Sequence, residues 1–198
     1  VAARKLQDYK MTKTEEFIIK IHNILKVLPI HTEISFSVTD NNETTYFGLR
    51  KDSEEISYLN NKASAFEIGS VTKSFTGNLL AQLVVDGKVN LDDPISNFLS
   101  FELKGNPTIT LKQLGMHTSG LPRMPADYDD RKNFIKENPF SNYNEDELIT
   151  YLTKELKMEC EPGEKAIYSN LGSGLLSYIM SQIESRPFSE IVEEKIFK

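Results

Sequence analysis

The sequence of 198 residues contains no tryptophan and only one cysteine, Cys160. A single cysteine cannot form a disulfide within the chain, which excludes a disulfide-stapled fold. No run of residues approaches the roughly 18 apolar positions of a transmembrane helix, so we expect no transmembrane segment. The first residues also lack the apolar stretch of a signal peptide.

Basic charge is scarce as well, because 29 acidic residues outnumber 23 lysines and arginines and leave a net charge of −6. The chain has no basic run, so we expect no nucleic-acid partner and no binding to an anionic membrane surface. It also lacks clustered histidines and cysteines, so we expect no metal ion and no cofactor. What remains is an ordinary globular composition with enough apolar residues for a core.

Residues 12–65 carry the patterns of a helix followed by a β-hairpin. A capping box at 12–15 opens an amphipathic helix. Alternating apolar residues then predict strands over 32–38 and 44–49, joined by a turn. Residues 51–65 are polar, and we expect them to be irregular. The helix should face a core with Phe17, Ile18, Ile21, Ile24, Leu25 and Leu28.

Residues 66–198 have a mostly helical pattern. A buried helix should run up to Gly87, a natural residue for a helix end. Capping boxes that begin at Thr110 and Asn144 predict two more helices. The stretch 123–143 is rich in charge, Asn, Pro and Tyr, which indicates a long loop. The strands are therefore confined to the start of the chain.

Ser70 and Lys73 stand three residues apart at the start of the predicted buried helix. Residues at this spacing share one helix face, so the serine oxygen and the lysine nitrogen can touch. A serine hydroxyl needs a neighbouring base to become a good nucleophile, and a helix start favours developing negative charge. The pair therefore indicates an acyl-transfer nucleophile. A bare Ser-x-x-Lys is a weak signal, however, and a serine here could also be an ordinary helix cap.

Tyr168 and Asn170 form the second chemical candidate. The alternative is a polar loop in which Asn170 caps the helix that follows. The same Tyr-x-Asn pattern occurs at 58–60, but that copy precedes Ser70. Only the later copy follows a Pro-Gly turn, at 162–163.

Taken together and in order, these motifs resemble the serine β-lactamase and penicillin-binding-protein superfamily. The resemblance rests on Phe66–Lys73, Asp86–Pro94, His117–Pro122, Pro162–Gly163 and Tyr168–Asn170. The last three narrow it to the class C β-lactamase-like branch, which includes D-alanyl-D-alanine carboxypeptidases, D-aminopeptidases and esterases. The resemblance implies an α/β (α+β) fold of the β-lactamase/transpeptidase type. Such a fold has an antiparallel sheet with flanking helices and a helical lobe.

The resemblance also implies that Ser70 attacks a carbonyl and forms an acyl-enzyme, with Lys73 and Tyr168 as the proton-transfer pair. Both of these groups have ordinary pKa values near 10, and an ammonium beside a phenol favours the phenolate. The two should therefore titrate jointly. Asn170 would bind Lys73 and a substrate amide oxygen, and the Ser70 backbone N–H would serve the oxyanion hole. We expect His117 to anchor a loop rather than to catalyse.

The third motif of the family, Lys-Thr-Gly or His-x-Gly, does not occur after Asn170. In the family its strand lines the site and supplies a second oxyanion donor, and loss of such a donor costs about 10²–10³ in rate. We therefore interpret residues 1–198 as a single incomplete domain, with 12–65 as its helix and hairpin and 66–198 as its helical lobe. The C-terminal strands would belong to a missing part of the same domain, which puts the activity of these residues alone in doubt.

The function expected from these motifs is a serine hydrolase acting on D-amino-acid peptides, β-lactams or small esters. Its partner would be a small-molecule or peptide substrate, and its place outside the cytoplasm, in the periplasm or cell envelope. Two alternatives stay open: a weak or inactive relative that acts as a penicillin-recognising sensor or interaction module, and a folded fragment without activity.

Overall fold

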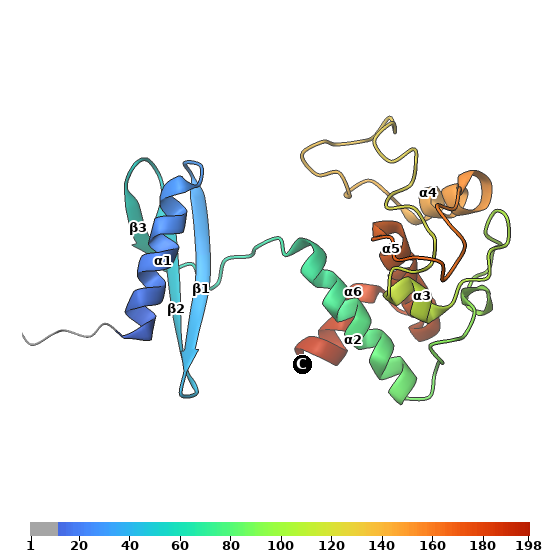
Figure 1. The fold of residues 1–198 in the computed structure, drawn as a ribbon, viewed down its shortest axis with the longest axis horizontal. Coiled ribbons are helices and arrows are strands. Elements are labelled where there is room, and N and C mark those ends of the chain that lie inside the picture. The colour runs from blue at the N-terminus through green and yellow to red at the C-terminus, as the bar shows by residue number, and fades with distance from the viewer. Residues whose placement is uncertain (1–11) are drawn as a thin grey trace, which may run out of the picture. The chain divides into compact units, whose positions relative to one another are not determined.

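The computed structural model describes residues 12–198, which form two compact units divided between Glu67 and Ile68 (Figure 1). The first unit is a three-stranded antiparallel sheet with one helix. The second is built from helices and long loops. The fold is therefore α+β with an antiparallel sheet, as expected from the sequence.

Helix α1 (Lys13–Val27) opens at the predicted capping box. The Thr12 hydroxyl accepts a hydrogen bond from the Glu15 N–H, and the Glu15 carboxylate accepts one from the Thr12 N–H. Leu25 is fully buried where α1 packs on the sheet. The expectation that Phe17 and Ile24 also face the core is wrong. Both side chains are exposed, because the three strands cover only part of the apolar stripe of α1.

The sheet contains β1 (Thr32–Asp40), β2 (Glu43–Lys51) and β3 (Ile56–Leu59), in that order. The predicted hairpin of β1 and β2 is confirmed. Its turn residues Asn41 and Asn42 both have positive φ. Asparagine tolerates this left-handed backbone, and such turns match the twist of the paired strands.

The prediction that residues 51–65 are irregular is wrong, because β3 pairs with β2 inside that stretch. None of the four residues of β3 is fully buried. A short edge strand with so little burial lacks a clear apolar alternation, the pattern by which strands are recognised in a sequence.

The helical unit covers residues 68–198. Its helices are α2 (Thr72–Val85), α3 (Leu111–Gly115), α4 (Glu145–Thr150), α5 (Asn170–Glu184) and α6 (Phe188–Val192). Helix α2 ends just before Gly87, whose φ of 68° needs a glycine, as predicted. Both predicted capping boxes are present: Thr110 caps α3 and Asn144 caps α4.

One hydrophobic core holds this unit together, with α2 and α3 packed on α5. Its fully buried side chains include Leu79 and Leu83 of α2, and Leu175 and Ile179 of α5. The predicted apolar spacing of α2 is thus confirmed. Because α2 and α5 share this core, the residues at their N-terminal ends are held in fixed positions next to each other.

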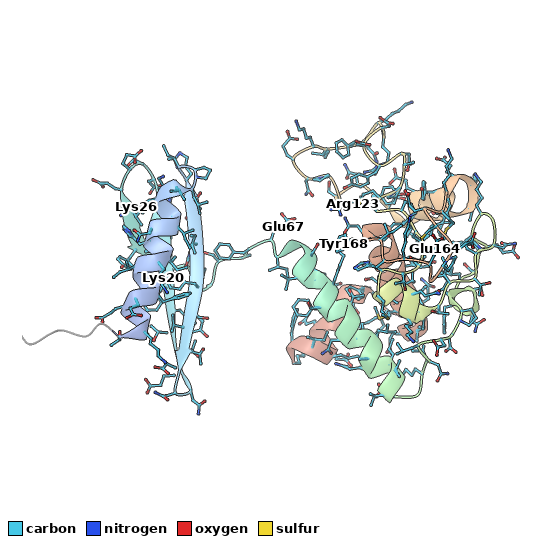
Figure 2. All side chains as sticks on the ribbon, viewed as in Figure 1. Lys20, Lys26, Glu67, Arg123, Glu164 and Tyr168 are labelled. Atoms are coloured by element: carbon cyan, nitrogen blue, oxygen red, sulfur yellow. The ribbon has the colours of Figure 1, made fainter. Side chains whose placement is uncertain are left out.

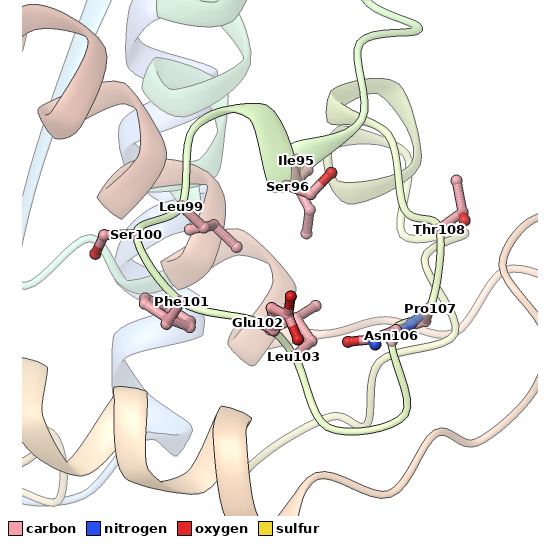
Figure 3. A pocket seen from close by; sticks show the side chains of 10 residues that line it. All are labelled: Ile95, Ser96, Leu99, Ser100, Phe101, Glu102, Leu103, Asn106, Pro107 and Thr108. Atoms are coloured by element: carbon pink, nitrogen blue, oxygen red, sulfur yellow. The ribbon is translucent and has the colours of Figure 1, made fainter.

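Loops make up much of the rest of this unit. A loop that includes residues 95–108 surrounds a hollow of about 460 Å³ (Figure 3). Residues 117–143 contain neither helix nor strand, which confirms the long loop expected at 123–143. Within residues 12–198, we find no helix with both the length and the apolar character that crossing a membrane requires.

Candidate active site

Ser70 lies in a short 3-10 turn, Gly69–Val71, that leads directly into α2. Gly69 has a φ of 51°, and a side chain there would meet open space, so the turn needs glycine for its backbone angle alone. One turn further on, the Lys73 ammonium donates a hydrogen bond to Ser70 Oγ at 3.1 Å. The contact expected from the i, i+3 spacing is therefore present.

Tyr168 reaches the same serine from the segment just before α5. Its hydroxyl lies 2.7 Å from Ser70 Oγ, and the Lys73 nitrogen lies 4.9 Å from the centre of its ring. Ser70 Oγ is thus within hydrogen-bonding distance of both an ammonium and a phenol. This is the arrangement that an activated nucleophile requires.

Asn170 completes the group by accepting a hydrogen bond from Lys73 at 2.9 Å through Oδ1. The alternative in which Asn170 caps α5 is wrong, because Ser169 is the cap. The Ser169 hydroxyl accepts from the Gly172 N–H at 2.8 Å and donates to the Pro122 carbonyl at 2.7 Å. Because Ser169 caps α5, the side-chain amide of Asn170 is available to hold Lys73.

His117 anchors the loop around the site, as expected. Its Nδ1 accepts a hydrogen bond from the Ser169 N–H at 3.2 Å, and its carbonyl accepts one from the Ile167 N–H at 2.8 Å. Burial lowers the pKa of the imidazole, and the nearby Lys73 charge lowers it further. The neutral ring and the backbone carbonyl of His117 thus hold one residue on each side of Tyr168, Ser169 and Ile167 respectively.

Sequence reasoning missed Arg123, which lies beside Tyr168 (Figure 2). Its guanidinium carbon is 5.1 Å from the centre of the Tyr168 ring, within the range of a cation–π contact. Its carbonyl accepts a hydrogen bond from the Asn170 N–H at 2.9 Å. The residue directly follows the motif His117–Pro122, but nothing in its spacing along the chain indicates that its side chain turns towards Tyr168.

The surroundings of Tyr168 lower the pKa of its phenol. The largest cause is the side-chain hydrogen bond with Lys73, followed by the bond with Ser70, and the charge of Arg123 contributes in the same direction. A lower pKa means a larger fraction of phenolate at a given pH. The arrangement therefore favours a proton acceptor beside the Ser70 hydroxyl.

Two hollows of the helical unit differ in whether a residue of this group lines them. None of Ser70, Lys73, Tyr168 and Asn170 lines the larger hollow of Figure 3. Asn170 does line a smaller pocket, of about 250 Å³. Among residues 12–198, no three His, Cys, Asp or Glu side chains gather as a metal ion would require.

Comparison with known proteins adds independent information. A family model described as Beta-lactamase matches residues 31–198. The chain is 28% identical to a beta-lactamase of Pseudomonas fluorescens over 165 residues, 82% of this chain and 42% of that protein. It is 32% identical over 139 residues to the D-alanyl-D-alanine-carboxypeptidase/endopeptidase AmpH of Escherichia coli strain K12, 67% of this chain and 34% of that protein.

Among solved structures, a beta-lactamase/D-alanine carboxypeptidase from Yersinia pestis superposes with a TM-score of 0.65. It is 26% identical in sequence, and the match covers 83% of this chain and 46% of that one. The chain thus spans less than half of the length of each of these relatives.

Proposed function

Because this chain belongs to the beta-lactamase family, we propose that it carries the nucleophile of a serine hydrolase, Ser70. The observation behind the proposal is the position of Ser70 Oγ, 3.1 Å from Lys73 Nζ and 2.7 Å from the Tyr168 hydroxyl. A hydroxyl held between an ammonium and a phenol of lowered pKa has a place to send its proton.

In the proposed reaction, Ser70 Oγ attacks a substrate carbonyl carbon while its proton passes to the Lys73–Tyr168 pair. The carbonyl oxygen becomes an oxyanion, towards which the Ser70 backbone N–H would donate at the start of α2. The bond to the leaving nitrogen or oxygen then breaks, and the leaving group takes the proton. The product is an ester of Ser70.

Water completes the cycle by the reverse route. The Lys73–Tyr168 pair takes a proton from water, and the resulting hydroxide attacks the ester carbonyl. The bond to Ser70 Oγ breaks, and the serine recovers its proton from the pair. Asn170 would keep Lys73 in place throughout and would donate from its Nδ2 to a substrate amide oxygen.

We propose substrates among D-amino-acid peptides, β-lactams and small esters, and a place in the class C-like branch. The D-alanyl-D-alanine carboxypeptidase and beta-lactamase relatives support the first two substrate classes by their names. An extracytoplasmic location is also proposed, and it rests on the resemblance alone.

The test is covalent labelling of the full-length protein, followed by intact mass. A fluorescent penicillin or a fluorophosphonate should add one adduct at Ser70. Ser70→Ala should remove the adduct, whereas Ser74→Ala, an exposed serine of α2, should keep it. If neither probe labels a folded protein, the hydrolase proposal fails. An adduct that never turns over would instead favour the sensor alternative.

A further inference from the structure

His117 follows α3 and has a left-handed backbone, with a φ of 59°. Its N–H donates to the Leu114 carbonyl at 3.3 Å, and the next N–H, of Thr118, donates to the Gln113 carbonyl at 2.9 Å. These two bonds form a Schellman motif, a common helix end in which glycine or asparagine usually holds the position of His117. The backbone alone therefore gains nothing from an imidazole here, and any benefit of histidine lies in its ring.

The His117 ring supports the backbone beside Tyr168. Its Nδ1 accepts the hydrogen bond from the Ser169 N–H, and within residues 12–198 that N–H has no other partner. Ser169 is 1% exposed, so bulk water does not replace the imidazole. The centre of the same ring lies 4.6 Å from the centre of the Tyr168 ring. His117 thus contacts the tyrosine directly and fixes the residue that follows it.

Protonation of His117 would remove this acceptor, because an imidazolium ion donates from both nitrogens and accepts at neither. A buried N–H without a partner is costly, so the backbone at Ser169 would shift towards another acceptor. Burial lowers the pKa of His117, and the Lys73 charge lowers it further. The neutral, accepting form is therefore present at neutral pH and is lost as pH falls below about 6.5, the usual pKa of histidine.

The charged and titratable groups around the ring are Lys73 of α2, Tyr168 ahead of α5 and, beside the Tyr168 ring, Arg123 (Figure 2). An imidazolium would add another positive charge, and a positive charge favours the Tyr168 phenolate. Tyr168 is 39% exposed, however, so solvent screens that gain. Displacement of the phenol from Ser70 is the larger effect, because a shift of about 1 Å can cost about 100-fold in rate.

We propose that His117 is a positioning residue whose neutral ring holds Tyr168 against Ser70, so that its protonation switches the site off in acid. This inference rests on the proposed function, since it describes the regulation of the same nucleophile. The need for the Tyr168 phenolate already makes the logarithm of the acylation rate rise with pH at a slope of about one. A second group that must be neutral raises the slope to about two below its own pKa.

Asparagine is the most informative replacement for His117. It tolerates the left-handed backbone, its Oδ1 can accept the Ser169 N–H, and it does not titrate. His117→Asn should therefore keep most of the wild-type rate near neutral pH and lose the steeper acid limb. Glycine suits the backbone but has no ring, so His117→Gly should lower the rate near neutral pH by up to about 100-fold.

His31 provides a matched control for the asparagine substitution. It also has a positive φ, of 69°, but its side chain is 77% exposed and lies 3.6 Å from the Asp52 carboxylate. It belongs to the sheet unit. His31→Asn thus makes the same change on the same kind of backbone, and it should leave the pH profile unchanged.

The experiment measures the second-order rate constant for labelling of Ser70 in the full-length protein from about pH 4 to pH 8. The probe is a fluorescent penicillin or, where that reacts too slowly, a fluorophosphonate. Far-ultraviolet circular dichroism at each pH, and recovery of the rate on return to neutral pH, identify the range in which the protein stays folded. Wild type and His31→Asn should show the steeper acid limb, whereas His117→Asn should keep a slope of about one throughout.

Failure of the proposed function is distinguishable from failure of this inference. If Ser70→Ala is labelled as fast as wild type, or neither is labelled, the proposed function fails and this inference fails with it. If labelling depends on Ser70 but wild type and His117→Asn have the same acid limb, His117 is not the switch. A wild-type limb that flattens in acid would show that the imidazolium charge outweighs the loss of position. A near wild-type rate in His117→Gly would show that the ring does not position Tyr168.

Discussion

The Tyr168 hydroxyl lies 2.7 Å from Ser70 Oγ although 98 positions separate the two residues in the chain. The shared core of α2 and α5 brings them together, with Leu79 and Leu175 among its fully buried side chains. Lys73 and Asn170 meet across the same pair of helices at 2.9 Å. The packing of α2 against α5 therefore positions the site, and substitutions that loosen the N-terminal end of either helix should disturb its geometry.

Lys73 is the first residue to test. Lys73→Met should slow acylation of Ser70 by about 10²–10⁴, the usual contribution of a positioned acid–base group. Lys73→Arg should not restore the rate, because an arginine stays protonated and cannot accept a proton. Stopped-flow labelling with a fluorescent penicillin measures the rate of acylation of both variants. An arginine variant with a near wild-type rate would mean that Lys73 serves only as a fixed charge.

Arg123 should influence the pH dependence of the reaction. Its charge helps to lower the pKa of Tyr168, so Arg123→Gln should raise that pKa. A step that needs the phenolate gains rate as pH rises through this pKa, and the acidic limb of the kcat/KM profile should therefore move to higher pH. Arg186→Gln, whose side chain pairs with Glu184 and Glu194 instead, is the control and should leave the limb in place. If the acidic limb of the kcat/KM profile stays in place in Arg123→Gln, the charge of Arg123 does not help to set the pKa of Tyr168.

Local signals carried most of what could be predicted from the sequence. The capping boxes and the Ser70–Lys73 contact involve residues three apart, so they need no knowledge of the rest of the fold. The partnership with Tyr168 required the order of motifs along the chain. Strand β3 and the position of Arg123 depend on packing between segments distant in sequence, and no local pattern encodes either one. The fixed shape of the loop at 123–143 also depends on contacts between separate segments, since Arg131 donates a hydrogen bond to the Asn142 carbonyl and pairs with Glu147 of α4.

Ser169 should matter for stability because it caps α5 from a buried position. Ser169→Ala removes the bond to the Gly172 N–H and the bond to the Pro122 carbonyl, and should lower the free energy of unfolding by about 1–2 kcal/mol. Ser173→Ala, one turn further along α5, should have little effect because its hydroxyl only bonds back to the Ser169 carbonyl. Urea unfolding of the two variants side by side gives the comparison. Equal losses would show that the cap is not the cause.

Two tyrosines of the helical unit should respond to the same substitution with opposite signs. Within residues 12–198 the buried hydroxyl of Tyr143 has no hydrogen-bond partner, and burial raises the pKa of its phenol. Burial also raises the pKa of Tyr151, but hydrogen bonding from the backbone of Ala126 and Lys157 opposes that rise. A buried polar group without a partner costs about 1–3 kcal/mol, whereas a satisfied hydrogen bond stabilises by about 1 kcal/mol.

Tyr143→Phe should therefore raise the free energy of unfolding by about 1 kcal/mol, and Tyr151→Phe should lower it by a similar amount. Both substitutions keep the ring, so packing is matched between them. Urea unfolding of the full-length protein, followed by far-ultraviolet circular dichroism, measures the two changes. A loss of stability in Tyr143→Phe would show that its hydroxyl is paired in solution, through a water molecule or a movement of the loop at 123–143.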